Sequence, residues 1–209
     1  MSNKNYNIIE SIFNSRTNIL NILKKRNFNI EDYENYSLKE LAIQYENKQL
    51  DLLLNSNENE KKIYIKFYVY KNIKTNNIYD IIEDLFTLEK ILTKYDDLII
   101  IIKDEPNDTL IQSIKDIWVN DNIYVSLLNI KRLQFNILEH SLVPPHRAIS
   151  QNEAINVKNM YNVSDQQLPN ISYFSPVSLV MGFRPGDIIE IKRKSRTSIH
   201  NFYYRICKI

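Results

Sequence analysis

The sequence predicts an α+β protein with two domains, formed by residues 1–138 and 139–209. In the first part, strand-like apolar runs alternate with apolar stripes of helical period, which predicts a mixed sheet flanked by helices. Pro144 and Pro145 then mark a linker, because the residue before a proline is pushed out of helical geometry. Both glycines of the chain fall in one short helix–turn–strand pattern near the carboxyl end. We therefore expect an α/β or α+β domain followed by a small α+β domain.

The chain is expected to begin with two helices and a hairpin. Residues 5–25 carry their apolar side chains along a helical stripe. Ser37 precedes a second stripe and can cap that helix, with Glu40 completing a capping box. Residues 50–55 and 62–70 have strand composition and are separated by polar residues, which predicts a β-hairpin.

The rest of the first domain should alternate helix and strand. We expect an amphipathic helix over residues 78–95 and a second helix over 109–118. The apolar run 98–102 predicts a strand buried on both faces. Residues 123–130 predict another strand, and 134–137 a short one.

The second domain is expected to open with a helix over residues 152–161 and to continue into a shorter one. Ser175 is a suitable N-cap, and Pro176 then occupies the first helical position. About two turns later, Gly182 is placed to end that helix in the left-handed conformation. The scarce glycine therefore predicts a sharp helix end.

A turn and two strands should complete the domain. The sequence Arg184–Asp187 places Pro185 and Gly186 at the two central positions of a type II turn. Residues 188–194 alternate as a strand, and residues 202–209 form the closing strand, most simply paired with it antiparallel.

Composition limits the classes of protein that fit. A hydrophobic fraction of 44% with 25% charged residues is typical of a globular protein, and the net charge of +2 argues against a free-standing nucleic-acid binder. Cys207 is the only cysteine, so no internal disulfide is expected and a reducing compartment is favoured. No signal peptide or membrane-spanning run is found. Frequent Asn, Ile, Lys and Tyr indicate an AT-rich gene, as in a large DNA virus or a protist.

Two motifs in the same order resemble one family. EHSLVPPH (residues 139–146) matches the pattern EHxLVPxH, and LPNI, SPVSLVMGFRPGDIIEIKR and YYR follow it. Together they resemble the C-terminal assembly domain of the fifth-largest subunit of eukaryotic nuclear RNA polymerases, and its short counterpart in archaeal RNA polymerases. The rest of the chain resembles that family in length and element order. In that N-terminal part, the family has a domain that forms part of the jaw that grips downstream DNA. The fold of this domain is related to restriction endonucleases.

The resemblance implies a non-catalytic subunit of a multi-subunit DNA-directed RNA polymerase. The second domain would dock on the largest subunit, and the jaw would lie near duplex DNA within the complex. No cofactor, metal, membrane or small-molecule substrate is implied, and no cluster of acids for magnesium is visible. We expect a viral source, with the host cytoplasm and virion as its location, or the nucleus if the source is cellular. The docking residues implied by the resemblance are Pro176, Gly182, Arg184, Pro185, Gly186, Asp187, Lys192, Arg193, Ser195, Thr197, Tyr204 and Arg205.

The chain departs from the family pattern at two places. Only Thr109 aligns with a Thr-Pro-Ser-Ala segment that lies near downstream DNA, and the neighbouring acids would repel phosphate unless Asp108 or Thr109 caps the helix. In the closing hairpin, Arg196 replaces a glutamate and Ile199 a glycine. The charge reversal indicates that the partner surface has changed as well.

Two alternative functions stay open. Asp51 with Glu60, Lys61 and Lys62 supplies the residue types of a divergent metal-dependent nuclease, although Glu60 sits in a polar loop. A stand-alone nucleic-acid module would use cations among aromatics near the carboxyl end. That cluster comprises Lys192, Arg193, Lys194, Arg196, Arg205 and Lys208, with Phe202, Tyr203 and Tyr204. The candidate zinc ligands His140, His146, His200 and Cys207 match no zinc template.

Overall fold

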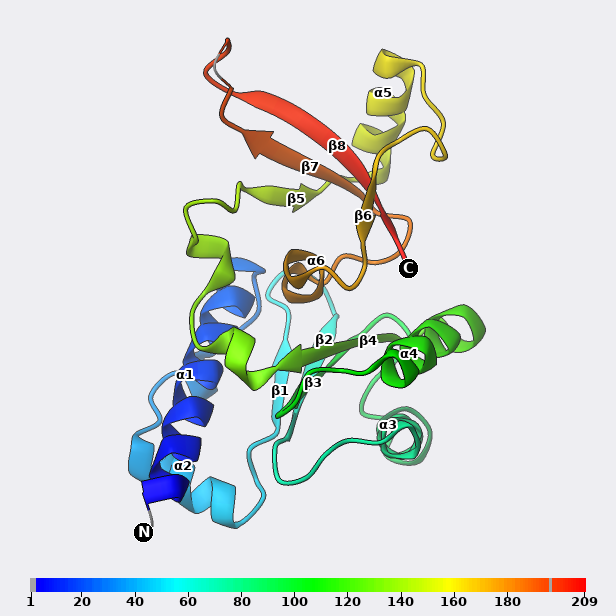
Figure 1. Cartoon of the computed structure of the whole chain (residues 1–209). Coiled ribbons are helices and arrows are strands. Elements are labelled where there is room, and N and C mark those ends of the chain that lie inside the picture. Colours follow the sequence, from blue (N-terminus) through cyan, green and yellow to red (C-terminus); the bar gives the residue numbers. More distant parts are fainter. Residues whose placement is uncertain (1–2, 196) are drawn as a thin grey trace. The chain divides into compact units, whose positions relative to one another are not determined.

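The computed structural model describes residues 3–195 and 197–209, and the chain divides into two compact units (Figure 1). The N-terminal unit is Met1–Asn136 and the C-terminal unit is Ile137–Ile209. Each unit has its own four-stranded mixed sheet with helices against it, so the α+β class is confirmed. Within the described residues, no helix is long and apolar enough to cross a membrane.

The sheet of the N-terminal unit has the order β1-β2-β3-β4. Strands β1 (Leu52–Asn55) and β2 (Lys62–Tyr68) form the expected antiparallel hairpin. Strands β3 (Asp97–Ile102) and β4 (Tyr124–Asn129) then extend the sheet in parallel. Every residue of β3 and β4 is buried, which confirms the prediction of a strand covered on both faces.

Helices cover both sides of this sheet. Figure 1 shows α1 (Asn3–Lys25) and α2 (Leu38–Glu46) on one side, and α3 (Thr75–Ile82) and α4 (Asp108–Asp121) on the other. Helix α2 begins at the expected capping box, because the Ser37 side chain accepts from the backbone of residue 40, whose carboxylate accepts in return. Helices α3 and α4 lie on the same face because each belongs to a right-handed crossover between neighbouring parallel strands, β2–β3 and β3–β4.

The predicted helix over residues 78–95 is wrong at its carboxyl end. Helix α3 passes into a π-helical segment, Glu83–Leu88, and the chain then leaves helical geometry at Lys90, where φ is +52°. The cause is Asp96, whose carboxylate accepts from the backbone N–H of Thr93 at 2.6 Å and of Lys62 at 2.6 Å. Because the Thr93 N–H in the loop donates to this carboxylate, it is not available for a helical hydrogen bond, and the helix does not continue.

Two smaller predictions are also wrong. Residues 134–137 form no strand, because the Gln134 amide turns inward and donates to the carbonyls of Ser11 and Ile130. The N-cap of α4 is Asn107, not Asp108 or Thr109, since the Asn107 side chain accepts from the Leu110 N–H at 3.0 Å. The 3-10 turn Ile130–Leu133 ends the unit's regular structure.

The sheet of the C-terminal unit has the order β5-β7-β8-β6. Strands β7 (Ile188–Arg193) and β8 (Asn201–Lys208) pair antiparallel as expected. Strand β5 (His146–Ala148) pairs antiparallel with β7, and β6 (Asn170–Ser172) pairs parallel with β8.

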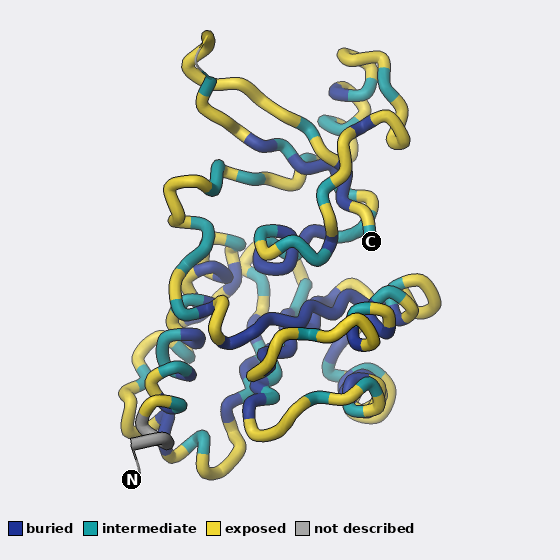
Figure 2. Tube along the Cα trace, viewed as in Figure 1, coloured by how far each residue is buried: buried dark blue, intermediate teal, exposed yellow. Residues whose placement is uncertain are grey.

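Two helices and a 3-10 turn complete this unit. They are α5 (Gln151–Tyr161), α6 (Pro176–Met181) and the turn Ile137–Glu139. The burial pattern in Figure 2 shows that β7 and β8 are buried where they run beside β6 and exposed toward the hairpin tip. One end of the hairpin is therefore anchored in a core, and the other is free to present side chains outward.

Candidate subunit-docking surface

Helix α6 is fixed at both ends by the residues that the sequence indicated. The Ser175 hydroxyl accepts from the Ser178 N–H at 3.2 Å, and Pro176 occupies the first turn. At the other end Gly182 has φ +72° and ψ +36°, and its N–H donates to the Ser178 carbonyl at 2.9 Å. The predicted cap, proline start and left-handed end are all confirmed.

The following turn is closed by two hydrogen bonds. The Asp187 N–H donates to the Arg184 carbonyl at 3.0 Å, as a β-turn requires, and the Arg184 N–H donates to the Asp187 carboxylate at 2.7 Å. Gly186 has φ +98°, which is the conformation that the third position of a type II turn demands. The ring of Pro185 restricts its own φ to the range that the second position of the turn needs.

This turn is also bonded to the closing strand. The Gly186 N–H donates to the Cys207 carbonyl at 2.9 Å, and the Cys207 N–H donates to the Asp187 carbonyl at 2.8 Å. Beside them the Phe183 ring is buried, and burial raises the pKa of the Cys207 thiol to about 12. Residues 175–187, which we call the corner, are thus held by backbone hydrogen bonds and by the short side chains of Ser175 and Asp187.

The corner has an inner and an outer face. Ser178, Leu179 and Val180 are buried against the domain, whereas Pro176 and Gly186 are exposed. The outer face therefore has a fixed backbone shape with few side-chain torsions, which lowers the entropy that is lost when a partner binds.

The β7–β8 hairpin carries the next group of predicted docking residues. Lys192 and Arg193 are exposed, and the Arg193 guanidinium lies 5.3 Å from the centre of the Tyr203 ring. Near the tip the hydroxyls of Ser195 and Thr197 are 3.2 Å apart. These residues lie on the hairpin and toward its tip, away from the corner. The predicted docking surface therefore has two separate parts.

The remaining predicted docking residues are tied into the fold. The Tyr204 hydroxyl donates to Glu190 at 3.2 Å, and the Arg205 side chain donates to the Asn170 carbonyl at 3.3 Å. Burial and Glu190 raise the pKa of Tyr204. Arg196, which departs from the family pattern, lies outside the described residues.

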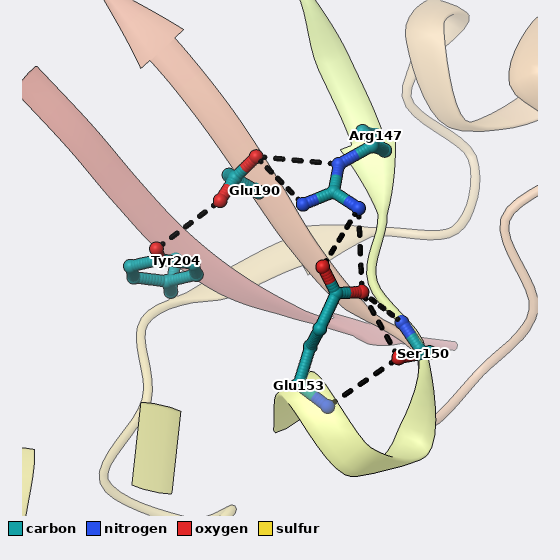
Figure 3. Close-up of polar contacts among 5 residues, drawn as sticks. All are labelled: Arg147, Ser150, Glu153, Glu190 and Tyr204. Atoms are coloured by element: carbon teal, nitrogen blue, oxygen red, sulfur yellow. Dashed lines mark hydrogen bonds and ion pairs between the residues drawn. The ribbon is translucent and has the colours of Figure 1, made fainter. Parts of the chain in front are cut away.

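A polar network that sequence reasoning missed joins four elements of this unit, β5, α5, β7 and β8. Figure 3 shows Arg147 between Glu190, at 3.1 Å, and Glu153, at 3.0 Å. Glu153 also accepts from the backbone and hydroxyl of Ser150, which together with Arg147 lowers its pKa. Glu190 accepts from Tyr204 as well. The spacing of Ser150 and Glu153 is a capping-box signal that could have revealed half of the network.

The network leaves the hairpin cations without carboxylate partners. Glu153 and Glu190 are engaged by Arg147, and Asp165 pairs with Lys158 at 2.6 Å. Within the described ranges, the basic residues of β7, β8 and their connection form no ion pair. They are Lys192, Arg193, Lys194, Arg205 and Lys208.

Thr109 lies in the other unit, beside a polar cavity of about 340 Å³. Its hydroxyl donates to the Asn107 side chain at 2.9 Å, so it supports the cap of α4. The start of α3 borders the same cavity, which places two positive helix ends and Lys74 together. Of the nearby acids, Glu105 is paired with Arg132 at 2.9 Å.

The residues considered for nuclease chemistry engage other partners. Asp51 accepts from the Tyr64 hydroxyl at 3.2 Å and from Lys66 at 3.0 Å, while Lys61 lies 2.8 Å from the buried carboxylate of Asp97. In the part of the chain that the structure describes, no three His, Cys, Asp or Glu side chains are placed to hold a metal ion.

Comparison with known proteins places the C-terminal unit in a defined class. Residues 135–207 match the family model described as RNA polymerase Rpb5, C-terminal domain. The chain is 42% identical over 73 residues to the DNA-directed RNA polymerase subunit Rpo5 of Thermococcus celer, covering 35% of this chain and 89% of that protein. For Rpo5 of Aeropyrum pernix the identity is 46% over 69 residues, covering 33% and 77%. For Rpo5 of Archaeoglobus fulgidus it is 35% over 74 residues, covering 35% and 97%.

The matched segment coincides with the unit that carries the corner and the hairpin. The chain therefore belongs to the family of RNA polymerase subunits Rpb5 and Rpo5. The resemblance drawn from the two sequence motifs is confirmed.

Proposed function

We propose that this chain is a non-catalytic subunit of a multi-subunit DNA-directed RNA polymerase. The observation that carries the proposal is that its C-terminal unit spans 89% of an archaeal relative named as a DNA-directed RNA polymerase subunit. The corner supports a scaffolding function, because its backbone hydrogen bonds hold an exposed surface in one shape before any partner binds.

The C-terminal unit docks on the largest polymerase subunit through the corner and the hairpin. This unit contains nine Lys and Arg against five Asp and Glu, whereas the N-terminal unit contains 18 against 20. Since the hairpin cations have no carboxylate partners within the described residues, the partner surface opposite the hairpin is acidic.

The N-terminal unit acts as a jaw near downstream DNA. Its small negative charge gives no bulk attraction to DNA, so contact with phosphate occurs only in the assembled enzyme and only at local sites. The cavity at Thr109 is such a site, because the helix ends of α3 and α4 and the Lys74 ammonium favour an anion there. Composition supports a viral source.

Co-purification with the largest subunit tests the docking. Lys192→Glu combined with Arg193→Glu should weaken binding at least tenfold, since like charges then oppose the acidic partner. Lys131→Glu, an exposed site in the other unit, is the matched control and should bind normally. Equal binding by all three chains would refute docking through the hairpin.

A second candidate function is a single-strand nucleic-acid platform on the same hairpin. It is favoured by the exposed rings of Phe202 and Tyr203 beside cations, an arrangement on which bases can stack. Fluorescence anisotropy with single-stranded RNA and DNA separates the two functions. Tight binding by the isolated chain that falls steeply with salt supports the platform, and weak binding supports the scaffold.

A further inference from the structure

The N-terminal unit contains a buried arginine that has no hydrogen-bond acceptor within the described part of the chain. Arg16 lies on α1 and is 2% exposed, and among the described residues none of its three guanidinium nitrogens has a hydrogen-bond partner. Arginine is almost never fully buried unless it is paired, because removing its charge from water costs several kcal/mol. The surroundings of Arg16 therefore need explaining.

Two tyrosine rings compensate only part of this cost. The guanidinium carbon is 4.5 Å from the centre of the Tyr36 ring and 5.7 Å from that of Tyr33. Cation–π contacts attract the guanidinium to the ring faces but leave its N–H donors without acceptors. The carboxylate of Glu34 is bound to Lys24 at 2.6 Å, so it does not neutralise Arg16.

A cavity of about 150 Å³ borders the same side chain. It is large enough for several waters or a small polyatomic ion, and too small for a nucleotide. The side chains of Tyr36 and Asn21 also line it, and neither has a hydrogen-bond partner among the described residues. The lining consists of Phe13, Arg16, Thr17, Leu20, Asn21, Ile30, Tyr33, Glu34, Tyr36 and Leu41.

We propose that this cavity binds a small tetrahedral oxyanion of the phosphate class. The Arg16 guanidinium turns into the cavity to donate to it, and the Tyr36 hydroxyl and the Asn21 amide are further donors. Burial lowers the pKa of Arg16, but an arginine stays protonated at neutral pH, so the site keeps its positive charge. This site is independent of the proposed docking and of the cavity at Thr109.

The segment over the cavity is suited to such a ligand. The 3-10 turn Glu31–Tyr33 and the following residues link the bridge at Phe28 to α2, and they supply both tyrosines. An ion held by Arg16 and Tyr36 would therefore join α1 to this connection. Binding should raise the stability of the whole unit.

Thermal unfolding of the full chain in inorganic phosphate tests the proposal. Fluorescence of Trp118, the only tryptophan, reports on the unit that contains Arg16. At a hundredfold excess over the dissociation constant, phosphate should raise the melting temperature by about 5–10 °C over sodium chloride of equal ionic strength. An equal effect of both salts would overturn the proposal.

Three variants define the site. Arg16→Met should lose the response to phosphate and, in phosphate-free buffer, melt no lower than the natural chain, because an uncompensated buried charge is removed. Tyr36→Phe keeps the ring over the guanidinium but removes the hydroxyl, so phosphate should bind about tenfold more weakly. Arg132→Met, an exposed arginine already paired with Glu105, should respond like the natural chain.

The variants also give the results that would count against the site. A normal phosphate response in Arg16→Met would overturn the proposal. If that variant does not fold, an unchanged phosphate affinity in Tyr36→Phe would overturn it instead, because the Tyr36 hydroxyl is one of the proposed donors. Stabilisation by a short DNA duplex but not by inorganic phosphate would mean that Arg16 binds a polynucleotide backbone rather than a free oxyanion. That result would also overturn the proposal.

Discussion

Replacement of Gly186 by valine tests the corner directly. A Cβ atom built on Gly186 meets no atom within 4 Å, so a clash with neighbours contributes nothing. The cost comes only from φ, which at +98° is a conformation that a β-branched residue rarely adopts. Such strain costs about 1–3 kcal/mol, and the stiffer unfolded chain offsets up to about 1 kcal/mol of it. We therefore expect a net loss of about 1–2 kcal/mol.

Hydrogen–deuterium exchange measures this loss at the corner itself. The Gly186 and Cys207 amides donate across the turn and strand β8, so their exchange reports the opening of this contact. A loss of 1–2 kcal/mol should accelerate exchange about five- to thirtyfold. Gly182→Asn is a matched control, because asparagine tolerates the left-handed values of φ and ψ found there.

The result that would refute this reasoning is an unchanged exchange rate in Gly186→Val. Such a result would mean that the turn does not hold its glycine at positive φ in solution. Normal co-purification of the valine variant with the largest subunit would count against the corner as the docking element, even if its exchange were faster.

Three further predictions concern other parts of the fold. Ser37→Ala should lower the free energy of unfolding of the N-terminal unit by about 1 kcal/mol through loss of the capping box, as measured by urea titration of Trp118 fluorescence. Asp97→Asn should cost about 3 kcal/mol in the same assay, because two cations at 2.8 and 2.9 Å lose their buried partner; a loss below 1 kcal/mol would contradict this. The raised pKa of Cys207 favours the neutral thiol in the folded state, so its contribution to stability is complete below the unfolded pKa of about 8.5 and is lost as pH rises toward about 12. Circular dichroism in denaturant should show a decline of about 1.4 kcal/mol per pH unit across that window, and Cys207→Ala should lack it.

Elements specified by neighbouring residues could be predicted from the sequence. The capping box at Ser37, the proline start and glycine end of α6, and the turn at Gly186 each depend on residues within a few positions of one another. Their hydrogen bonds close over short chain distances, so the residue types alone indicate the geometry.

Features that depend on distant partners could not be predicted. The helix after Thr75 stops early because Asp96 also caps Lys62, 34 positions away in the chain. Arg147 and Glu190 are 43 positions apart and meet only when β5 pairs with β7. The burial of Arg16 likewise follows from the packing of the segment after Phe28. No local sequence pattern predicts that packing.

The corner and the hairpin tip are maintained by different forces, and this decides where the proposed docking surface can diverge. At the corner, backbone bonds and two glycines of positive φ set the shape, so few substitutions preserve it. At the tip, Ser195 bonds to the hydroxyl and backbone N–H of its near neighbour Thr197, and Ile199 is 85% exposed. In the hairpin, the departure from the family pattern that lies within the described residues, Ile199, falls at this tip. A co-adapted partner should therefore keep the surface that receives the corner and differ in charge opposite the hairpin.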